Sequence, residues 1–389
     1  MNDSKATFAA SQIQISKSAL KHNLDFIRNK IGKSTRFSSV VKGNAYGHDI
    51  SVLVPLAEHF GVNHFSVFSA DEAWQVKNCV TDQSDVMIMG SIPDEALGWA
   101  VENDVEITIF ELDRLHLLLK TAHKLGKKAR IHIELETGMN RTGIESHQFS
   151  ALVDLLKLYP DDWQLEGLST HYAGAESTGN YLRVKRQIKR YRSAVEQLRD
   201  FGLNPKRLHT ACSAAAFSYP ETILDMARIG IAQYGYWPSR ETYMHHYLKK
   251  PGQQDPLKRV LSWTSKVMSI KEVAAGEFIG YGTSYLAGIP TRVAAVPVGY
   301  AHGFSRNLSN LGRVIVGGHR TSAVGVINMN MMMIDVTEVP HVQRGDEVVI
   351  IGEQEGQTIS VSSFSELSQN LNYETLVRLP SDIPRVVID

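Results

Sequence analysis

Between about residues 36 and 230, short apolar runs alternate with segments that have helical periodicity. Runs of this length are typical of buried strands. Helical patterns follow several of them, at 50–60, 70–79, 94–102 and 112–125. In the last of these segments, leucines recur at helical spacing. Strands that alternate with helices indicate an α/β fold with a parallel sheet covered on both faces. The predicted strands are 36–41, 64–68, 86–90, 105–110, 129–135, 164–170, 207–210 and 226–229.

Eight strands in roughly 195 residues are enough to close a (β/α)8 TIM barrel. We therefore predict that residues 17–250 form such a barrel. A doubly wound open sheet is the alternative, because periodicity alone does not show closure. After about residue 255, β-rich runs separated by Gly, Asn and Asp turns predict a C-terminal mostly-β domain over 251–389, with a polar linker at 249–256. Residues 1–16 are expected to form an N-terminal strand that packs with this domain.

Charge and composition exclude several classes of partner. The chain has 389 residues, with 41 Lys+Arg and 41 Asp+Glu, so its formal net charge is zero. Such a chain has no global field that attracts nucleic acid or an anionic membrane. The basic run 183–192 has no aromatic platform beside it and is interpreted as a solvated helix face. No signal peptide or long apolar segment is found, and two cysteines suit a reducing compartment, so we predict a cytoplasmic protein.

Candidate chemistry begins at Lys42, which ends the first predicted strand. The carboxyl ends of barrel strands carry the active site, and partial desolvation there lowers the pKa of an amine and makes it a Schiff-base nucleophile. A snorkelling lysine at a strand end would also fit this position alone. The loops after strands seven and eight, where phosphate binds in many barrels, contain Ser213, Gly230 and Ile231. A reactive lysine and a phosphate cradle on one rim are the layout expected for pyridoxal phosphate.

Four motifs resemble those of the alanine racemase family. They are VVKGNAYGH at 40–48, TGMNRTG at 137–143, GYG at 280–282 and NYE at 372–374, and they occur in the order and spacing of that family. The resemblance spans nearly the whole chain. It implies a pyridoxal-5'-phosphate-dependent homodimer of fold type III that interconverts L- and D-alanine, with active sites shared between subunits.

The same resemblance implies a role for each matching residue. Lys42 would hold the cofactor and act as one base, and Tyr281 from the partner subunit would be the opposite base, tuned by His171. Arg228 would face the pyridine nitrogen, with His209 behind it. The remaining assignments are Tyr46, Ser213, Gly230, Ile231 and Tyr373 for the phosphate, Arg141 for the phenolic oxygen and substrate, and Met329 with Asn330 for the substrate carboxylate. No metal is expected, because His245 and His246 lack further ligand spacing.

The chemistry of racemisation supports this set of residues. A proton must leave one face of a carbon and return to the other, so two bases must flank that carbon. Guanidinium stays protonated and cannot hand a proton to the pyridine ring, which makes the cofactor a weaker electron sink and favours rapid reprotonation. Related barrel-plus-β decarboxylases place an acidic residue there and use a cysteine near the C-terminus, whereas this chain has Arg228 and no cysteine after Cys212.

Two positions depart from the family pattern. Glu134 stands where many members carry a lysine that becomes carboxylated, and we hypothesise that it supplies a carboxylate to Arg141 directly; a structural carboxylate of a barrel layer is the alternative. Asn330 replaces the usual Asp, which removes a charge and either relaxes specificity or is neutral. A racemase of lysine, serine or a broad range of amino acids therefore stays open, as does a non-catalytic pyridoxal-phosphate carrier.

Overall fold

A computed structural model describes residues 9–249, 252, 254–368 and 372–389. The chain divides into two compact units. Residues 19–45 and 53–258 form one, here called the barrel unit; the start of the chain to residue 18, residues 46–52 and residues 259–389 form the other, the β unit. The linker predicted at 249–256 includes 250, 251 and 253, which lie outside the described residues.

The barrel unit contains a sheet of eight parallel strands among its described residues, in the order β8-β7-β6-β5-β4-β3-β2-β9. A bridge between Cys212 and Arg228 joins the two ends of this sheet, with the Arg228 amide donating to the Ala211 carbonyl at 2.9 Å. The predicted TIM-like barrel is thereby confirmed, rather than the open sheet. The strands are β2 (Arg36–Val40), β3 (His64–Val67), β4 (Asp85–Ile88), β5 (Glu106–Ile109), β6 (Ala129–Glu134), β7 (Trp163–Ser169), β8 (Arg207–His209) and β9 (Met226–Ile229).

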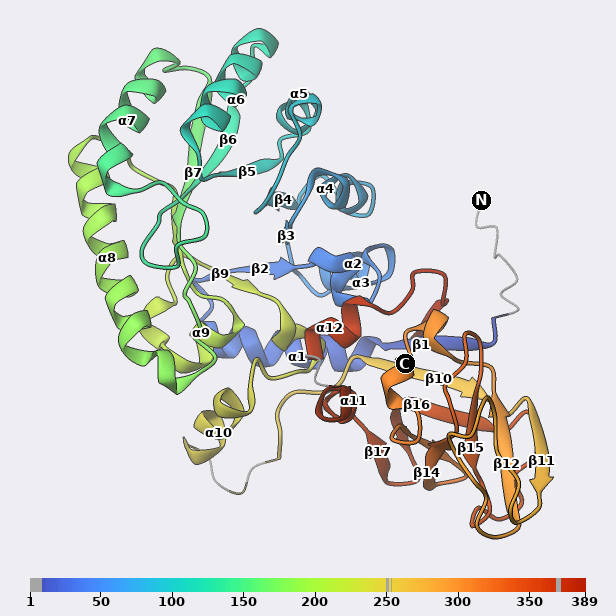
Figure 1. Cartoon of the computed structure of the whole chain (residues 1–389). Coiled ribbons are helices and arrows are strands. Elements are labelled where there is room, and N and C mark those ends of the chain that lie inside the picture. The colour runs from blue at the N-terminus through green and yellow to red at the C-terminus, as the bar shows by residue number, and fades with distance from the viewer. Residues whose placement is uncertain (1–8, 250–251, 253, 369–371) are drawn as a thin grey trace. The chain divides into compact units, whose positions relative to one another are not determined.

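Helices cover the outside of these strands (Figure 1). α6 shows why they form: it buries Leu115, Leu118, Leu119 and Ala122 on one stripe and ends where Gly126 takes a left-handed φ of 62°. The helices from the first to the tenth are α1 (Lys17–Ile31), α2 (Lys42–Tyr46), α3 (Ile50–His59), α4 (Ala70–Lys77), α5 (Leu97–Glu102), α6 (Leu112–Leu125), α7 (Phe149–Leu158), α8 (Tyr181–Asp200), α9 (Ser213–Ser218) and α10 (Arg240–Lys249).

The basic run 183–192 lies on α8. This helix buries an apolar stripe that includes Val184, Ile188 and Tyr191, whereas Arg186 and Lys189 are exposed. The charges therefore lie on the solvent side of an amphipathic helix. Among the described residues, no helix is long and apolar enough to span a bilayer.

The β unit is built around a ten-stranded sheet in the described part of the chain. β1 (Ser11–Ser16) pairs antiparallel with β10 and parallel with β18. The other elements are β10 (Leu261–Lys266), β11 (Ser269–Val273), β12 (Thr291–Val296), β13 (Arg313–Val316), β14 (His319–Val324), β15 (Met332–Asp335), β16 (Glu347–Gln354), β17 (Gln357–Ile359), β18 (Arg385–Ile388), α11 (Val361–Ser368) and α12 (Asn372–Val377).

The segment 46–52 belongs to the β unit although the barrel sequence surrounds it. Nη2 of Arg385 donates to the Gly47 carbonyl at 3.0 Å. A Cβ at Gly47 would lie 2.0 Å from the Leu376 carbonyl oxygen, so the backbone approaches too closely for any side chain. Only glycine fits at this position.

Candidate active site

Lys42 lies two residues after the end of β2, at the carboxyl end of the barrel, and begins α2. The chain then makes a left-handed turn, with φ values of 63° at Gly43, 51° at Asn44 and 54° at Ala45. Left-handed conformation costs about 1–2 kcal/mol per non-glycine residue, so surrounding contacts must hold it. Two such contacts are a 2.7 Å hydrogen bond from the Ala45 amide to the Val41 carbonyl and a 2.6 Å hydrogen bond from the Gly43 amide to Glu72.

Lys42 lies at the mouth of the barrel, and part of the residue is exposed to solvent. Desolvation by the surrounding protein lowers its pKa, and the nearby charges of Arg141 and Arg228 lower it further, while Glu72 opposes them. A lowered pKa increases the fraction of neutral amine near neutral pH. Lys42 is therefore suited to act as a nucleophile and as a base.

Arg228 is a buried cation on β9, anchored from β7 and β8. Its Nη1 donates to the His209 carbonyl at 2.9 Å and also contacts Nδ1 of the His209 ring. Its Nη2 donates to the Thr170 carbonyl at 2.7 Å. Burial lowers the pKa of this guanidinium, yet an arginine does not lose its proton in a protein. The guanidinium is thus a fixed positive charge, and His209 does lie against it.

The residues assigned to the phosphate fall into two groups, one in each unit. In the barrel unit, Ser213 begins α9, and its Oγ accepts a hydrogen bond from the Gly230 amide at 3.1 Å. Ile231 follows directly and begins a 3-10 turn. In the β unit, the rings of Tyr46 and Tyr373 lie 6.0 Å apart. Each group gathers hydroxyl groups, and the first adds backbone amides, which are the donors that a phosphate requires.

The loop after β6 contains Arg141, which is exposed. Glu136 shapes this loop by accepting hydrogen bonds from the amides of Gly138 and, at 2.9 Å, Asn140. Glu134 accepts from the Thr142 hydroxyl at 3.2 Å; within the described part of the chain it forms no ion pair with Arg141. Burial raises the pKa of Glu134, although the charges of Arg228 and Arg141 oppose this. The charges of Arg228 and Arg141 thus favour the ionised form of Glu134, while its burial favours the protonated form.

His171 follows β7 at the same end of the barrel. Burial lowers its pKa to about 3, and Arg228, Arg141 and Lys42 all contribute. The imidazole is consequently neutral near neutral pH, because protonation would add another cation to this cluster.

Tyr281, Met329 and Asn330 lie in loops of the β unit. Tyr281 is 72% exposed at a turn where Gly280 and Gly282 have φ values of 78° and 66°. A bridge between Phe278 and Leu286 closes the base of this loop. The backbone near Met329 is held as well, since its carbonyl accepts from the Ala301 amide at 2.9 Å.

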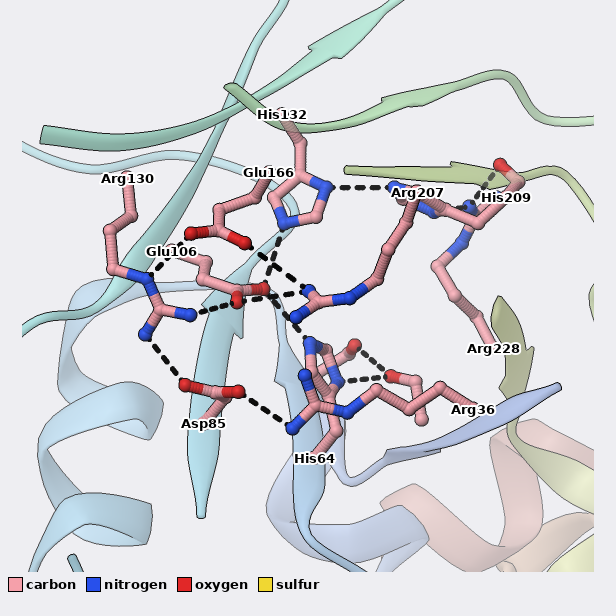
Figure 2. Close-up of polar contacts among 12 residues, drawn as sticks. Arg36, His64, Asp85, Glu106, Arg130, His132, Glu166, Arg207, His209 and Arg228 are labelled. Atoms are coloured by element: carbon pink, nitrogen blue, oxygen red, sulfur yellow. Dashed lines mark hydrogen bonds and ion pairs between the residues drawn. The ribbon is translucent and has the colours of Figure 1, made fainter. Parts of the chain in front are cut away.

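Sequence reasoning did not link the buried polar groups beneath Arg228 to the site. His132 of β6 and Glu106 of β5 continue the contacts of His209 into the barrel interior, as Figure 2 shows. A glutamate inside the apolar run 105–110 is the signal that could have identified this site, because an unpaired carboxylate is too costly to bury.

The barrel unit fits pyridoxal phosphate on its own geometry. The amine of Lys42 can form a carbon–nitrogen double bond with an aldehyde, and Arg228 offers a fixed cation to a ring nitrogen. Oγ of Ser213 accepts from the Gly230 amide, so its own hydrogen can be donated to a phosphate.

Comparisons with known proteins agree with this geometry. The family model for the alanine racemase N-terminal domain matches residues 15–238, and the model for the C-terminal domain matches residues 260–387. An alanine racemase of Leptospira interrogans is 33% identical over 385 residues, covering 98% of this chain and 96% of the relative. One of Syntrophobacter fumaroxidans is 33% identical over 369 residues, covering 94% of each chain.

Solved structures give the same result. The crystal structure of alanine racemase from Bacillus anthracis with bound L-Ala-P has a TM-score of 0.87 and 30% identity, covering 98% of this chain and 96% of that one. The alanine racemase of Clostridium difficile 630 has a TM-score of 0.89 at 27% identity, with the same coverage. Both domains, their order and the length of the match agree, and the chain therefore belongs to the alanine racemase family.

Proposed function

We propose that this protein is a pyridoxal-phosphate-dependent alanine racemase that interconverts L- and D-alanine. The observation that carries the proposal is the pairing, at one end of the barrel, of the partly exposed Lys42 with the buried guanidinium of Arg228. Family membership adds the expectation of alanine as the substrate, as in the relatives' names.

Lys42 would hold the cofactor and serve as the base on one face of the substrate. When bound, pyridoxal phosphate supplies a conjugated ring that draws electrons from the substrate α-carbon and acidifies its proton. The lowered pKa of Lys42 leaves its amine able to accept that proton. Arg228 would face the ring nitrogen without protonating it, and Ser213, Gly230, Ile231, Tyr46 and Tyr373 would bind the phosphate.

Tyr281 would supply the second base from the partner subunit of a homodimer. Its loop displays apolar side chains to solvent: Phe278 is 50% exposed, Leu286 53% and Ile289 61%. Several large apolar side chains on one loop are typical of a surface that a protein partner covers. A second copy of the chain would cover this loop and receive Tyr281 in its own site.

Substrate recognition would use Arg141 together with the loop that contains Met329 and Asn330. Arg141 would contact the cofactor's phenolic oxygen, and the backbone amide of Met329 would contact the substrate carboxylate. The product, D-alanine, is a precursor of bacterial cell walls in this family. Cytoplasmic localisation is part of the proposal and agrees with both cysteines being thiols.

One experiment tests the proposal. The purified protein, loaded with pyridoxal phosphate, is incubated with single L-amino acids in D2O while α-proton loss and formation of the D-enantiomer are followed together. Exchange and inversion of alanine alone support the proposal. Equal or faster inversion of lysine or serine would refute alanine specificity, exchange without inversion would refute the role of Tyr281, and no exchange would refute the racemase.

A further inference from the structure

A continuous line of hydrogen bonds leads from Arg228 into the barrel interior (Figure 2). Nη1 of Arg228 contacts Nδ1 of His209, and Nε2 of His209 lies 2.8 Å from Nδ1 of His132. Nε2 of His132 then lies 2.7 Å from Oε2 of Glu106. The side chains of His132 and Glu106 are fully buried, and His209 is 1% exposed. The contacts thus cross the barrel from β9 through β8 and β6 to β5.

The two ends of this line fix the direction of every hydrogen bond in it. A guanidinium can only donate, so Nδ1 of His209 must accept, and its Nε2 must carry the hydrogen. His132 must then accept at Nδ1 and donate from Nε2. An ionised carboxylate can only accept, so Glu106 requires this same direction from the opposite end. Both imidazoles are consequently neutral and each is held in its Nε2–H tautomer.

Glu106 is ionised because four groups donate to it. Oε1 accepts from Nη2 of Arg130 at 2.6 Å and from Nη1 of Arg207 at 3.3 Å. Oε2 accepts from His132 and, at 2.9 Å, from Nε2 of His64. Burial by itself would raise the pKa of Glu106, but these partners hold it well below its ordinary value. A buried carboxylate with this many donors keeps its charge.

The imidazole pair occupies space that a glycine leaves open. A Cβ at Gly167 of β7 would lie 2.6 Å from Nδ1 of His132 and 2.9 Å from Nε2 of His209, the two atoms that share the hydrogen bond. β7 passes between β6 and β8 in the sheet, so this strand alone separates the two rings. The absence of a side chain at Gly167 is what lets them meet.

We propose that Glu106 is a positioning residue for Arg228, acting through His132 and His209. The carboxylate holds His209 in the tautomer that accepts from Nη1, which in turn keeps the guanidinium plane fixed while Nη2 is held by Thr170. Glu106 and His132 are fully buried in the barrel interior, so their role would be exerted through His209. The functional part of this inference rests on the proposed function, in which Arg228 faces the cofactor ring.

Glu166 provides a matched control. Its side chain is also fully buried and contacts the same two arginines, Arg130 at 3.1 Å and Arg207 at 3.5 Å. Its other partners are Lys206 and Gln164, and within the described residues no hydrogen bond or ion pair joins it to a histidine. Glu166→Gln therefore removes one charge from the same ion cluster without altering the line to Arg228. Glu106→Gln instead introduces an amide that can donate to Nε2 of His132 and so permits the reverse direction.

Neutron diffraction from perdeuterated crystals at neutral pH locates the deuterium atoms on these rings. In the wild-type protein we expect deuterium on Nε2 and not on Nδ1 of both His209 and His132. In E106Q the reverse direction is no longer excluded at the Glu106 end, and we expect a second arrangement with deuterium on Nδ1 of His209. This arrangement breaks the contact with Nη1 of Arg228, because both atoms then carry hydrogen. E166Q should match the wild type. Deuterium on Nδ1 or on both nitrogens of wild-type His209, or an E106Q protein with unchanged deuterium positions, would overturn the proposal. The wild-type measurement stands alone if E106Q does not fold.

Kinetics of the loaded enzymes provide a second measurement. For E106Q we expect kcat for alanine to fall about tenfold with little change in KM, because a misplaced Arg228 affects the chemical step more than binding. E166Q should retain the wild-type kcat. Equal losses in both variants would refute a specific role for Glu106. If the wild-type protein racemises no amino acid, the proposed function fails, while the neutron measurement still decides whether Glu106 sets the tautomer of His209.

Discussion

Gly167→Ala tests, with one methyl group, whether the contact between His132 and His209 supports the site. The new Cβ would lie 2.6 Å from Nδ1 of His132, and this contact must lengthen by about 0.8 Å to reach the ordinary range that starts at 3.4 Å. The same methyl group would lie 2.9 Å from Nε2 of His209, so it would push apart the two nitrogen atoms that share a hydrogen bond. The backbone of Gly167 does not have a positive φ, so alanine is not strained there for conformational reasons.

The magnitude follows from two opposing contributions. Overpacking a closely packed interior costs about 1–3 kcal/mol. Replacing glycine with alanine in a strand returns about 0.5–1 kcal/mol by lowering the entropy of the unfolded chain. The free energy of unfolding should therefore fall by up to about 2.5 kcal/mol, which lowers the thermal midpoint by up to roughly 10 °C for a domain of this size class. Racemase kcat should fall by about tenfold or more, since displacements near 1 Å at a reacting group are this costly.

The assay compares thermal unfolding and alanine racemisation for G167A, the wild-type protein and G98A. Gly98 lies in α5, and a Cβ there would meet nothing within 4 Å. G98A should therefore stabilise the protein by about 0.5–1 kcal/mol and leave the racemisation rate unchanged. If G167A retains the wild-type thermal midpoint and racemisation rate, the hydrogen bond between His132 and His209 does not require glycine at position 167. Glu106 then does not act on Arg228 through these two rings.

Three further outcomes are expected. Burial raises the pKa of Glu134 in the folded state, so its charge lowers stability once the pH exceeds that pKa. Glu134→Gln should therefore keep or raise the thermal midpoint at pH 7 while it slows racemisation. Unchanged kinetics would contradict a functional link between Glu134 and Arg141. Arg141→Gln should raise the pKa of Lys42, because it removes a nearby positive charge. When pyridoxal phosphate is added to the cofactor-free protein, the pH below which attachment slows should then be higher than in the wild type. An unchanged pH profile would show that Arg141 does not tune the amine. Because the pKa of Glu106 is depressed in the folded state, its ionised carboxylate stabilises the fold above about pH 4.3, and this contribution is lost as the pH falls. The urea concentration at the unfolding midpoint should therefore decline more steeply in acid for the wild type than for E106Q. Parallel curves for the two proteins would count against an ionised Glu106.

Much of the barrel could be predicted from the sequence because its strands are short, apolar and regularly spaced. The predicted helix at 112–125 coincides with α6, where the leucine periodicity is strong and Gly126 marks the end. The left-handed turn after Lys42 was predictable only in part, because Gly43 and Asn44 tolerate a positive φ whereas Ala45 gives no sign of it. Their conformation is set by contacts with distant residues such as Glu72, which a local pattern does not contain.

The site divides in a similar way. Motifs identify Lys42, Arg141 and Arg228, whose chemistry depends on residue type. The contact between His132 and His209 depends instead on strand order and on a glycine in the intervening strand. Such a contact depends on the order of the strands in the closed sheet, and the residues next to His132 and His209 in the sequence do not predict it.

The segment 46–52 has a consequence for how this protein can be recombined. Because the chain leaves the barrel unit after residue 45 and returns at residue 53, no single cut separates the two units into independent pieces. Cleavage at the polar segment near residue 255 would place Gly47 on one fragment and its partners Leu376 and Arg385 on the other. A chimera that exchanges the β unit between relatives must therefore carry over residues 1–18 and 46–52 as well as 259–389, and Lys42 would then lie four positions before a foreign segment.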